Sequence, residues 1–196
     1  MVHAVNDEAL DTIFRAARTH GKWLDKPVSR ALLMAVYDLM RWGPTSANVS
    51  PARVVFVVSK EARERLRPCL DAGNVRQTMA APATAILGYD LDFARHLPKL
   101  YPQRPEAKDW FKDPGFAEKT AFRSGTLQGA YFIIAARALG LDCGPMSGFD
   151  NEGVDREFFA GTAIRSNFLC NFGYGDHAGL RERGPRLSFD EACKIV

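Results

Sequence analysis

The sequence predicts a single domain of 196 residues that mixes helices and strands, in an α/β or α+β fold. Two continuous apolar runs, RVVFVV at residues 53–58 and APATAILGY at 81–89, are typical of buried strands. Around them, apolar residues recur every three to four positions, which is typical of helices with one face in a core. A hydrophobic fraction of 46% suffices for one core, and no internal repeat divides the chain.

The N-terminal quarter predicts two helices. Asn6 can cap the first, whose apolar side chains share one face, and Gly21 is its predicted end. Ser29 can cap the second, which the pair Gly43-Pro44 ends. We expect the strand at 53–58 to be fully buried, because polar residues do not alternate within it.

Residues 60–70 are charged and predict a short helix, whereas residues 90–117 break the regular pattern. Prolines interrupt any long helix in that segment, and aromatic residues alternate with charged ones. A loose excursion of this length is typical of a lid over a site or of an interaction arm. The lid interpretation makes Tyr101 and Trp110 its apolar cover.

The next helix, at about 117–140, is apolar on nearly every face between residues 127 and 139. Such a helix must be covered on all sides, and we expect a second subunit to supply part of the cover. Extended segments follow at 141–150 and 166–176. Ser188–Glu191 fits a capping box that opens a last short helix.

Composition excludes several classes of function. A net charge of +3 without a dense Lys/Arg block indicates no nucleic acid and no membrane partner. No apolar run approaches the ~18 residues of a membrane span, and the N-terminus does not resemble a signal peptide, so we expect a cytoplasmic protein. Widely spaced cysteines predict mostly buried free thiols, and scattered histidines predict no metal site.

Neither a dinucleotide-binding GxGxxG, nor a P-loop, nor a GxSxG elbow is present. Four other segments carry the chemical signal: RTHGKW (18–23), GPTSANVSP (43–51), GPMSGFD (144–150) and RERGPRLSF (181–189). The two basic segments suit a phosphate, because arginine offers a planar fork of donors. The two small polar segments suit the edge of a flat heteroaromatic ring. Taken alone, each segment could also be a surface turn.

Together, these segments resemble the FMN-dependent nitroreductase family, and within it the malonic semialdehyde reductase branch of bacterial pyrimidine utilisation. The likeness covers essentially the whole chain, in order. It implies an α+β fold with a central, mostly antiparallel sheet flanked by helices. It also implies an intertwined homodimer with two FMN sites at the subunit interface and the helix at 127–139 in the dimer core.

The resemblance assigns flavin contacts to individual residues. The phosphate is assigned to Arg18, Thr19, His20 and Arg186, while a further basic residue of the family falls on Gly21 or Lys22. The ring loop supplies Thr45, Ser46 and Asn48, and the loop facing flavin N5 supplies Pro145, Met146, Ser147 and Gly148. Asn74 is assigned to the pyrimidine side of the ring. Gln77 stands where the family commonly has a lysine, and a neutral donor there would stabilise the reduced flavin less.

Simpler interpretations stay open for several of these residues. Thr45 and Ser46 could be turn hydroxyls bonded to their own backbone. Arg186 could be a solvated surface arginine, and His20 a local cap. Met146 could merely fill a gap, although a backbone role at its position would not depend on the side chain. Arg183 is assigned a structural role.

The implied activity is that of a flavin oxidoreductase in which NADH or NADPH delivers a hydride to FMN and a second substrate removes it. No catalytic side chain is therefore expected. The first choice of substrate is malonic semialdehyde, reduced to 3-hydroxypropionate, whose carboxylate needs a cation. Among Arg53, Arg95 and Arg123, we favour Arg123. The alternatives are a reductase of nitroaromatics or quinones, which an aromatic-lined excursion would favour, and a non-enzymatic FMN-binding dimer.

Overall fold

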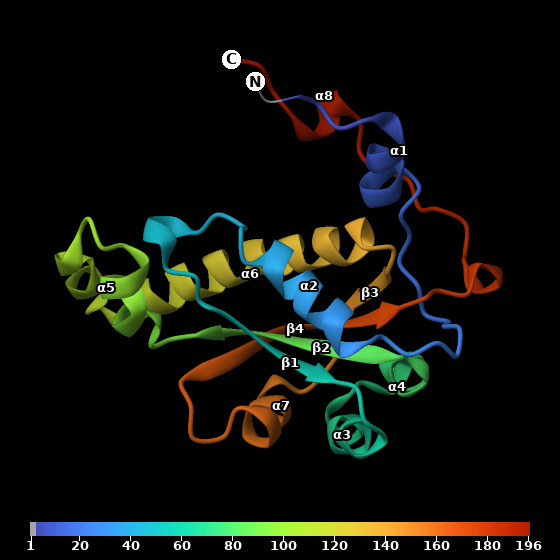
Figure 1. The fold of residues 1–196 in the computed structure, drawn as a ribbon, viewed down its shortest axis with the longest axis horizontal. Coiled ribbons are helices and arrows are strands. Elements are labelled where there is room, and N and C mark those ends of the chain that lie inside the picture. Colours follow the sequence, from blue (N-terminus) through green and yellow to red (C-terminus); the bar gives the residue numbers. More distant parts are fainter. Residues whose placement is uncertain (1–2) are drawn as a thin grey trace.

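The computed structural model describes residues 3–196, and at its centre lies a four-stranded sheet in the order β1-β2-β4-β3 (Figure 1). Each pair of neighbouring strands is antiparallel. The strands are β1 (Ala52–Val57), β2 (Ala83–Asp90), β3 (Asp142–Met146) and β4 (Ile164–Gly173). The sheet and its helices confirm the α+β architecture that the resemblance implies.

Helices cover both faces of the sheet (Figure 1). On one face, α2 (Arg30–Met40) and the long α6 (Pro114–Ala138) pack with Ala85 and Leu87 of β2. On the other face, Ile86 packs among residues of α3 (Lys60–Leu66) and α7 (Asn151–Phe158). Successive side chains of a strand point to opposite faces, so β2 contributes to both cores.

The two predicted strands differ in burial. All eight residues of β2 are buried, as expected for the middle of a sheet. In β1, five of six residues are only half-buried, and Val58 is exposed beyond the end of the strand. The expectation of full burial at 53–58 was wrong because β1 lies at the edge of the sheet in the single chain.

The first helix is shorter than predicted. Asn6 caps α1 (Asp7–Leu10), and one π-helical turn continues it to Arg15. The chain then becomes extended rather than helical as far as Gly21. The cause is pairing with β3, where Thr19 bridges Cys143 and the His20 amide donates to the Cys143 carbonyl at 3.0 Å. The cap at Ser29 and the capping box at Ser188, which opens α8 (Phe189–Ala192), are confirmed.

The segment 90–117 is not loose. It folds into short helices at Phe93–His96, α5 (Leu97–Leu100) and Pro105–Phe111, and α6 begins at Pro114, earlier than expected. The rings of Phe93 and Phe111 meet edge to face at 4.8 Å inside a third hydrophobic cluster. The prolines prevent a long helix, but the aromatic residues give the segment a core of its own.

Two helices, α4 (Ala72–Ala80) and α7, were not anticipated, because neither has a long apolar stripe. Cys69, Cys143 and Cys170 are buried free thiols and Cys193 is exposed, which confirms the expectation for cysteine. Among residues 3–196, no helix has both the length and the apolar character needed to cross a membrane.

Candidate functional site

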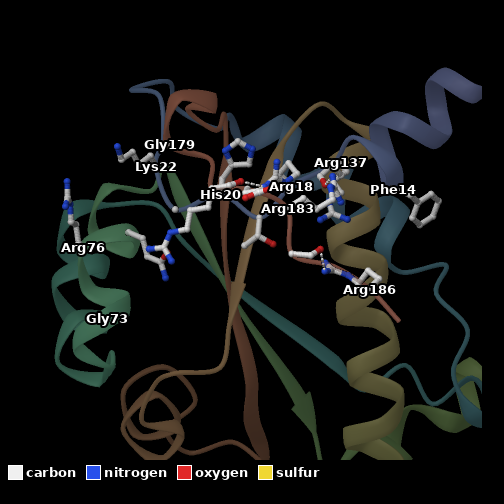
Figure 2. Close-up of a pocket in the computed structure, with 17 residues that line it drawn as sticks. Phe14, Arg18, His20, Lys22, Gly73, Arg76, Arg137, Gly179, Arg183 and Arg186 are labelled. Carbon is white, nitrogen blue, oxygen red and sulfur yellow. Dashed lines mark hydrogen bonds between the residues drawn. The ribbon is translucent and has the colours of Figure 1, made fainter. Parts of the chain in front are cut away.

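A cavity of about 890 Å³ lies where the extended segment 17–22, the start of α4, the end of α6 and the segment 179–186 meet (Figure 2). Its lining is strongly cationic, with Glu182 as the one acidic residue. The cationic residues are Arg18, Lys22, Arg76, Arg137, Arg181, Arg183 and Arg186. The cavity thus unites the two basic segments of the sequence, which are about 160 residues apart, in an environment that favours an anion.

Two arginines connect these basic segments through the backbone. Arg18 donates to the carbonyl oxygen of Arg181. Arg183 donates to the carbonyl oxygens of Arg15 and Ala17, both at 2.9 Å, as its assigned structural role requires. Arg186 instead donates to the carbonyls of Gly184 and Pro185 beside it. These bonds to neutral carbonyls leave the positive charges uncompensated.

Arg137 belongs to the cavity but was not singled out from the sequence. It comes from the end of α6, and Figure 2 shows it near Arg18 and Arg183. Its Nη1 donates to the carbonyl of Ile13 at 3.2 Å, while its buried Nε has no hydrogen-bond partner among the described residues. An arginine inside an otherwise apolar stretch was the only available signal.

An amide cluster joins the cavity to the loop after β3. Gln77 donates to Asn74 Oδ1 at 2.6 Å, and Asn74 donates to the carbonyl of Gly148 at 2.8 Å. A Cβ at Gly148 would lie only 2.6 Å from Asn74 Nδ2, so the close approach requires glycine. Met146 lies within 4.0 Å of Gln77 Nε2. The structure therefore brings together four of the predicted ring contacts, Asn74, Gln77, Met146 and Gly148. Pro145 lies just before Met146 in β3, and Ser147 is exposed.

The ring loop has an unusual backbone. Ala47, Asn48 and Ser50 all have positive φ, at 47°, 52° and 40°. Asparagine tolerates this region, but such a conformation costs ~1–3 kcal/mol at other non-glycine residues and is concentrated at functional sites. Thr45 Oγ1 accepts from the Ser50 amide at 3.2 Å, so this hydroxyl does bond to its own loop, while Ser46 is exposed.

The ring loop does not contribute to the cationic cavity of its own chain. Asn48 instead donates to the carbonyl of Leu100, at the end of α5, at 2.7 Å. Figure 1 shows α5 and α1 at opposite ends of α6, with the cavity at the α1 end. Thr45, Ser46 and Asn48 are thus separated from Arg18 and the other predicted phosphate contacts.

His20 lies in the cavity wall with a side chain that is almost completely buried, at 2% exposure for the residue. Its Nε2 is 3.3 Å from Asp142 Oδ1, but neither ring nitrogen makes a hydrogen bond within residues 3–196. Burial lowers the pKa of His20, although Asp142 opposes the shift. The imidazole therefore does not cap the local backbone.

The three candidates for a substrate carboxylate differ in their partners. Arg53 and Arg95 both pair with the buried Asp90, at 2.7 and 3.4 Å. Arg123 is exposed on α6 and has no ion pair or hydrogen bond within the described chain. Of the three, Arg123 therefore keeps its charge available.

Known proteins resemble this chain closely. The model of the nitroreductase family matches residues 5–174. A protein of Stenotrophomonas maltophilia, provisionally named NADH dehydrogenase/NAD(P)H nitroreductase, is 60% identical over 100% of both chains. A protein of the same provisional name from Cupriavidus pinatubonensis is 57% identical over 97% of this chain and 98% of its own length.

The fold has solved counterparts as well. A protein of Exiguobacterium sibiricum, provisionally described as a nitroreductase and crystallised in complex with FMN, superposes with a TM-score of 0.87. It covers 100% of both chains at 16% identity, which establishes a shared fold. Given the family match and the two full-length relatives, the chain belongs to the nitroreductase family.

Proposed function

We propose that the cationic cavity binds FMN, with the phosphate among Arg18, Thr19, Arg137 and Arg186. The observation that carries this proposal is the excess of seven cationic side chains over one carboxylate around a cavity of cofactor size. A phosphate dianion offers acceptors for several charge-assisted hydrogen bonds. The amide groups of Asn74 and Gln77, beside Gly148, fit the polar edge of a flat ring. The related fold that holds FMN in Exiguobacterium sibiricum supports the same ligand.

We propose further that two chains form an intertwined homodimer and complete each site together. One chain holds the cavity and the ring loop at opposite ends, so a second chain is the natural source of the missing loop. Large apolar side chains stand exposed on α2 and α6, and most globular proteins bury such a surface. On α2 they are Met34, Tyr37 and Leu39, with Trp42 just beyond its end, and on α6 they are Phe116, Phe122, Leu127 and Tyr131.

In this proposal, the protein orients substrates and excludes water around the cofactor. Bound FMN supplies the transfer of a hydride from NADH or NADPH to a second substrate. The cations hold the phosphate, and the strained loop at 45–50 presents its backbone and short side chains to the ring. Gln77 offers a neutral amide, which stabilises added negative charge less than a lysine would. The residues do not favour NADH over NADPH.

The second substrate that we propose is malonic semialdehyde, reduced to 3-hydroxypropionate in the cytoplasm. Arg123 supports this choice, because its charge is not engaged while Arg53 and Arg95 are held by Asp90. In the site that two chains would complete, this arginine would bind the carboxylate and place the aldehyde carbon near the ring. Arg123 is thus proposed as a substrate-binding residue.

A reductase of nitroaromatics or quinones is the second candidate, and the provisional names of the two relatives favour it. The excursion favours it less than expected. Phe93 and Phe111 are buried in its own core and cannot line a substrate site, whereas Trp110 remains 43% exposed. A non-enzymatic FMN-binding dimer would be excluded by rapid bleaching of the flavin with NADH or NADPH.

A stopped-flow pair of half-reactions tests these candidates. The flavin is first reduced with NADH or NADPH, and reoxidation is then followed with malonic semialdehyde or with a nitroaromatic compound lacking a carboxylate. Replacing Arg123→Gln should raise KM for the semialdehyde about 10-fold or more, since a hydrogen bond to a charged group contributes ~1.5–3 kcal/mol. The nitroaromatic reaction should be unchanged. Equal effects on both substrates would remove Arg123 from carboxylate binding.

A further inference from the structure

Three side chains that are far apart in the sequence meet beside the segment 18–23, to which one of them belongs. His20 comes from that segment, Asp142 from the start of β3, and His177 from the turn after β4. One nitrogen or oxygen atom from each lies within 4.8 Å of the others. The sequence predicts no metal site because these residues show no ligand spacing, and only the fold brings them together.

The buried member of the group lacks ordinary partners. His20 is 2% exposed, yet neither of its ring nitrogens makes a hydrogen bond among the described residues. The Asp142 oxygen is 3.3 Å from Nε2, but its direction does not satisfy a hydrogen bond. A buried polar atom without a partner is costly, and its persistence calls for an explanation such as a bound ion.

The surroundings hold this imidazole in one place. The amide of Gly175 donates to Asp142 Oδ2 at 3.0 Å, which fixes the carboxylate and leaves Oδ1 toward His20. A Cβ at Gly175 would collide with the His20 ring, so the backbone of Gly175 packs directly against the imidazole. The ring of His177 stands edge to face at 5.3 Å from that of His20. The surroundings thus hold His20 and Asp142 in place, whereas His177 is exposed.

The separation of His20 and Asp142 matches that of two neighbouring ligands of a transition-metal ion. Tetrahedral zinc has ligands at ~2.0–2.2 Å, which places neighbouring ligand atoms about 3.3 Å apart. The separation of His20 Nε2 and Asp142 Oδ1 already equals this edge. His177 is exposed and lies within 4.8 Å of the other two ligand atoms, so its side chain would have to move inward to complete the set.

We propose that His20, Asp142 and His177 bind one divalent transition-metal ion of the zinc type, with water in the fourth position. The ion would join the segment 18–23, β3 and the turn at His177–Gly179 behind the wall of the cationic cavity. Its role would be structural, since it gives the buried His20 Nε2 a partner and fixes the segment that carries Arg18. The site is separate from the flavin contacts proposed above, although the resemblance assigns His20 to the phosphate.

Metal binding can be measured without relying on enzyme activity. The purified protein, carrying whatever flavin it retains, is dialysed against a chelator and then titrated with Zn²⁺ by calorimetry. Cys193→Ser serves as the background, because the exposed thiol could bind zinc by itself. We expect one Zn²⁺ per chain and a higher Tm in its presence. With Co²⁺ as the probe, we expect visible absorption bands typical of a four-coordinate ion.

Two ligand variants and one control decide the outcome. His177→Ala, at an exposed position, and Asp142→Asn should each weaken Zn²⁺ binding at least 10-fold and remove the cobalt bands. His96→Ala changes a histidine in the separate excursion and should bind Zn²⁺ with the same affinity as the Cys193→Ser protein. No Zn²⁺ uptake by the Cys193→Ser protein would overturn the proposal. So would equal affinities of the His177→Ala and His96→Ala proteins.

Discussion

The side chain of Asn48 donates a hydrogen bond of 2.7 Å to the carbonyl of Leu100, and so ties the strained ring loop to the excursion. The connection continues through Val49, which packs in the same cluster as Phe93 and Leu97. The loop proposed to contact the flavin and the segment proposed to cover it therefore form one packed unit. A shift of the excursion should therefore also move the ring loop.

Within this unit, Trp110 and Phe111 are neighbours with different environments, and they test the lid hypothesis as a pair. Trp110 is 43% exposed, so Trp110→Ala should alter kcat/KM for the oxidising substrate and leave FMN affinity nearly unchanged. Phe111 is only 9% exposed in the cluster, and Phe111→Ala should destabilise the protein by ~3–5 kcal/mol. Thermal melts and both half-reactions are measured. If Trp110→Ala lowers Tm as Phe111→Ala does and slows both half-reactions together, Trp110 is a core residue.

Arg18 and Arg186 together should determine flavin retention. Replacing both by Ala removes charge-assisted bonds that contribute ~1.5–3 kcal/mol each, so the Kd for FMN should rise about 100-fold or more while the fold persists. Arg183→Ala is the matched control. It also removes a positive charge from the cavity, but Arg183 donates hydrogen bonds to the carbonyls of Arg15 and Ala17 and is not among the proposed phosphate contacts. Flavin absorbance after gel filtration is the measurement. Full occupancy in the double variant would exclude both residues from the site.

The proposed dimer can be tested at Ala130, which is exposed on α6 of the single chain. In a monomer, Ala130→Asp should change the free energy of unfolding by no more than ~0.5 kcal/mol. In the proposed dimer, it buries an unpaired charge and should leave aggregated or unfolded protein. Ile133→Asp is less decisive, because Ile133 already packs against the core of its own chain. Lys60→Asp on α3 is the control, and light scattering gives the mass. A folded, soluble monomer from Ala130→Asp would contradict the dimer.

Thiol reactivity should separate one cysteine from the other three. Burial raises the pKa of the Cys69 thiol and raises that of Cys170 strongly, so little reactive thiolate forms at either near pH 8. Cys193 is exposed and should react first with a disulfide reagent. A colorimetric assay on native protein should show one fast thiol per chain, which Cys193→Ser removes. A fast phase that survives this substitution would mean that a buried thiol becomes accessible.

Most of the fold could be predicted because its signals are local. The apolar runs of β1 and β2, the caps at Ser29 and Ser188 and the long α6 all carry their pattern within a few residues. The boundary of the first helix was missed because the decisive interaction, the pairing of Thr19 with Cys143, spans more than 120 residues. The core of the excursion was missed for a similar reason: alternating aromatic and charged residues do not reveal which rings turn inward.

The candidate site was predictable in its residue types but not in its arrangement. Two basic segments and two glycine-rich segments suggested a phosphate and a ring, and Arg18 and Arg186 line one cavity. Arg137 escaped notice because its one signal, an arginine in an otherwise apolar stretch, is also common at an ordinary helix terminus. The grouping of His20 with Asp142 and His177 was invisible, because it depends on three elements that meet only after folding.

The bonds that Arg18 and Arg183 make across the cavity have a consequence for biosynthesis. They join positions 163 to 168 residues apart, so one wall of the cavity is translated long before the other. At ~5–20 residues per second, the delay is about 8–30 s. Throughout that interval the nascent chain carries the arginine-bearing segment 17–22 without its counterpart at 179–186. If the cavity is the flavin site proposed above, capture of the cofactor follows synthesis of the last elements, which makes loading a late step that depends on the supply of flavin to completed chains.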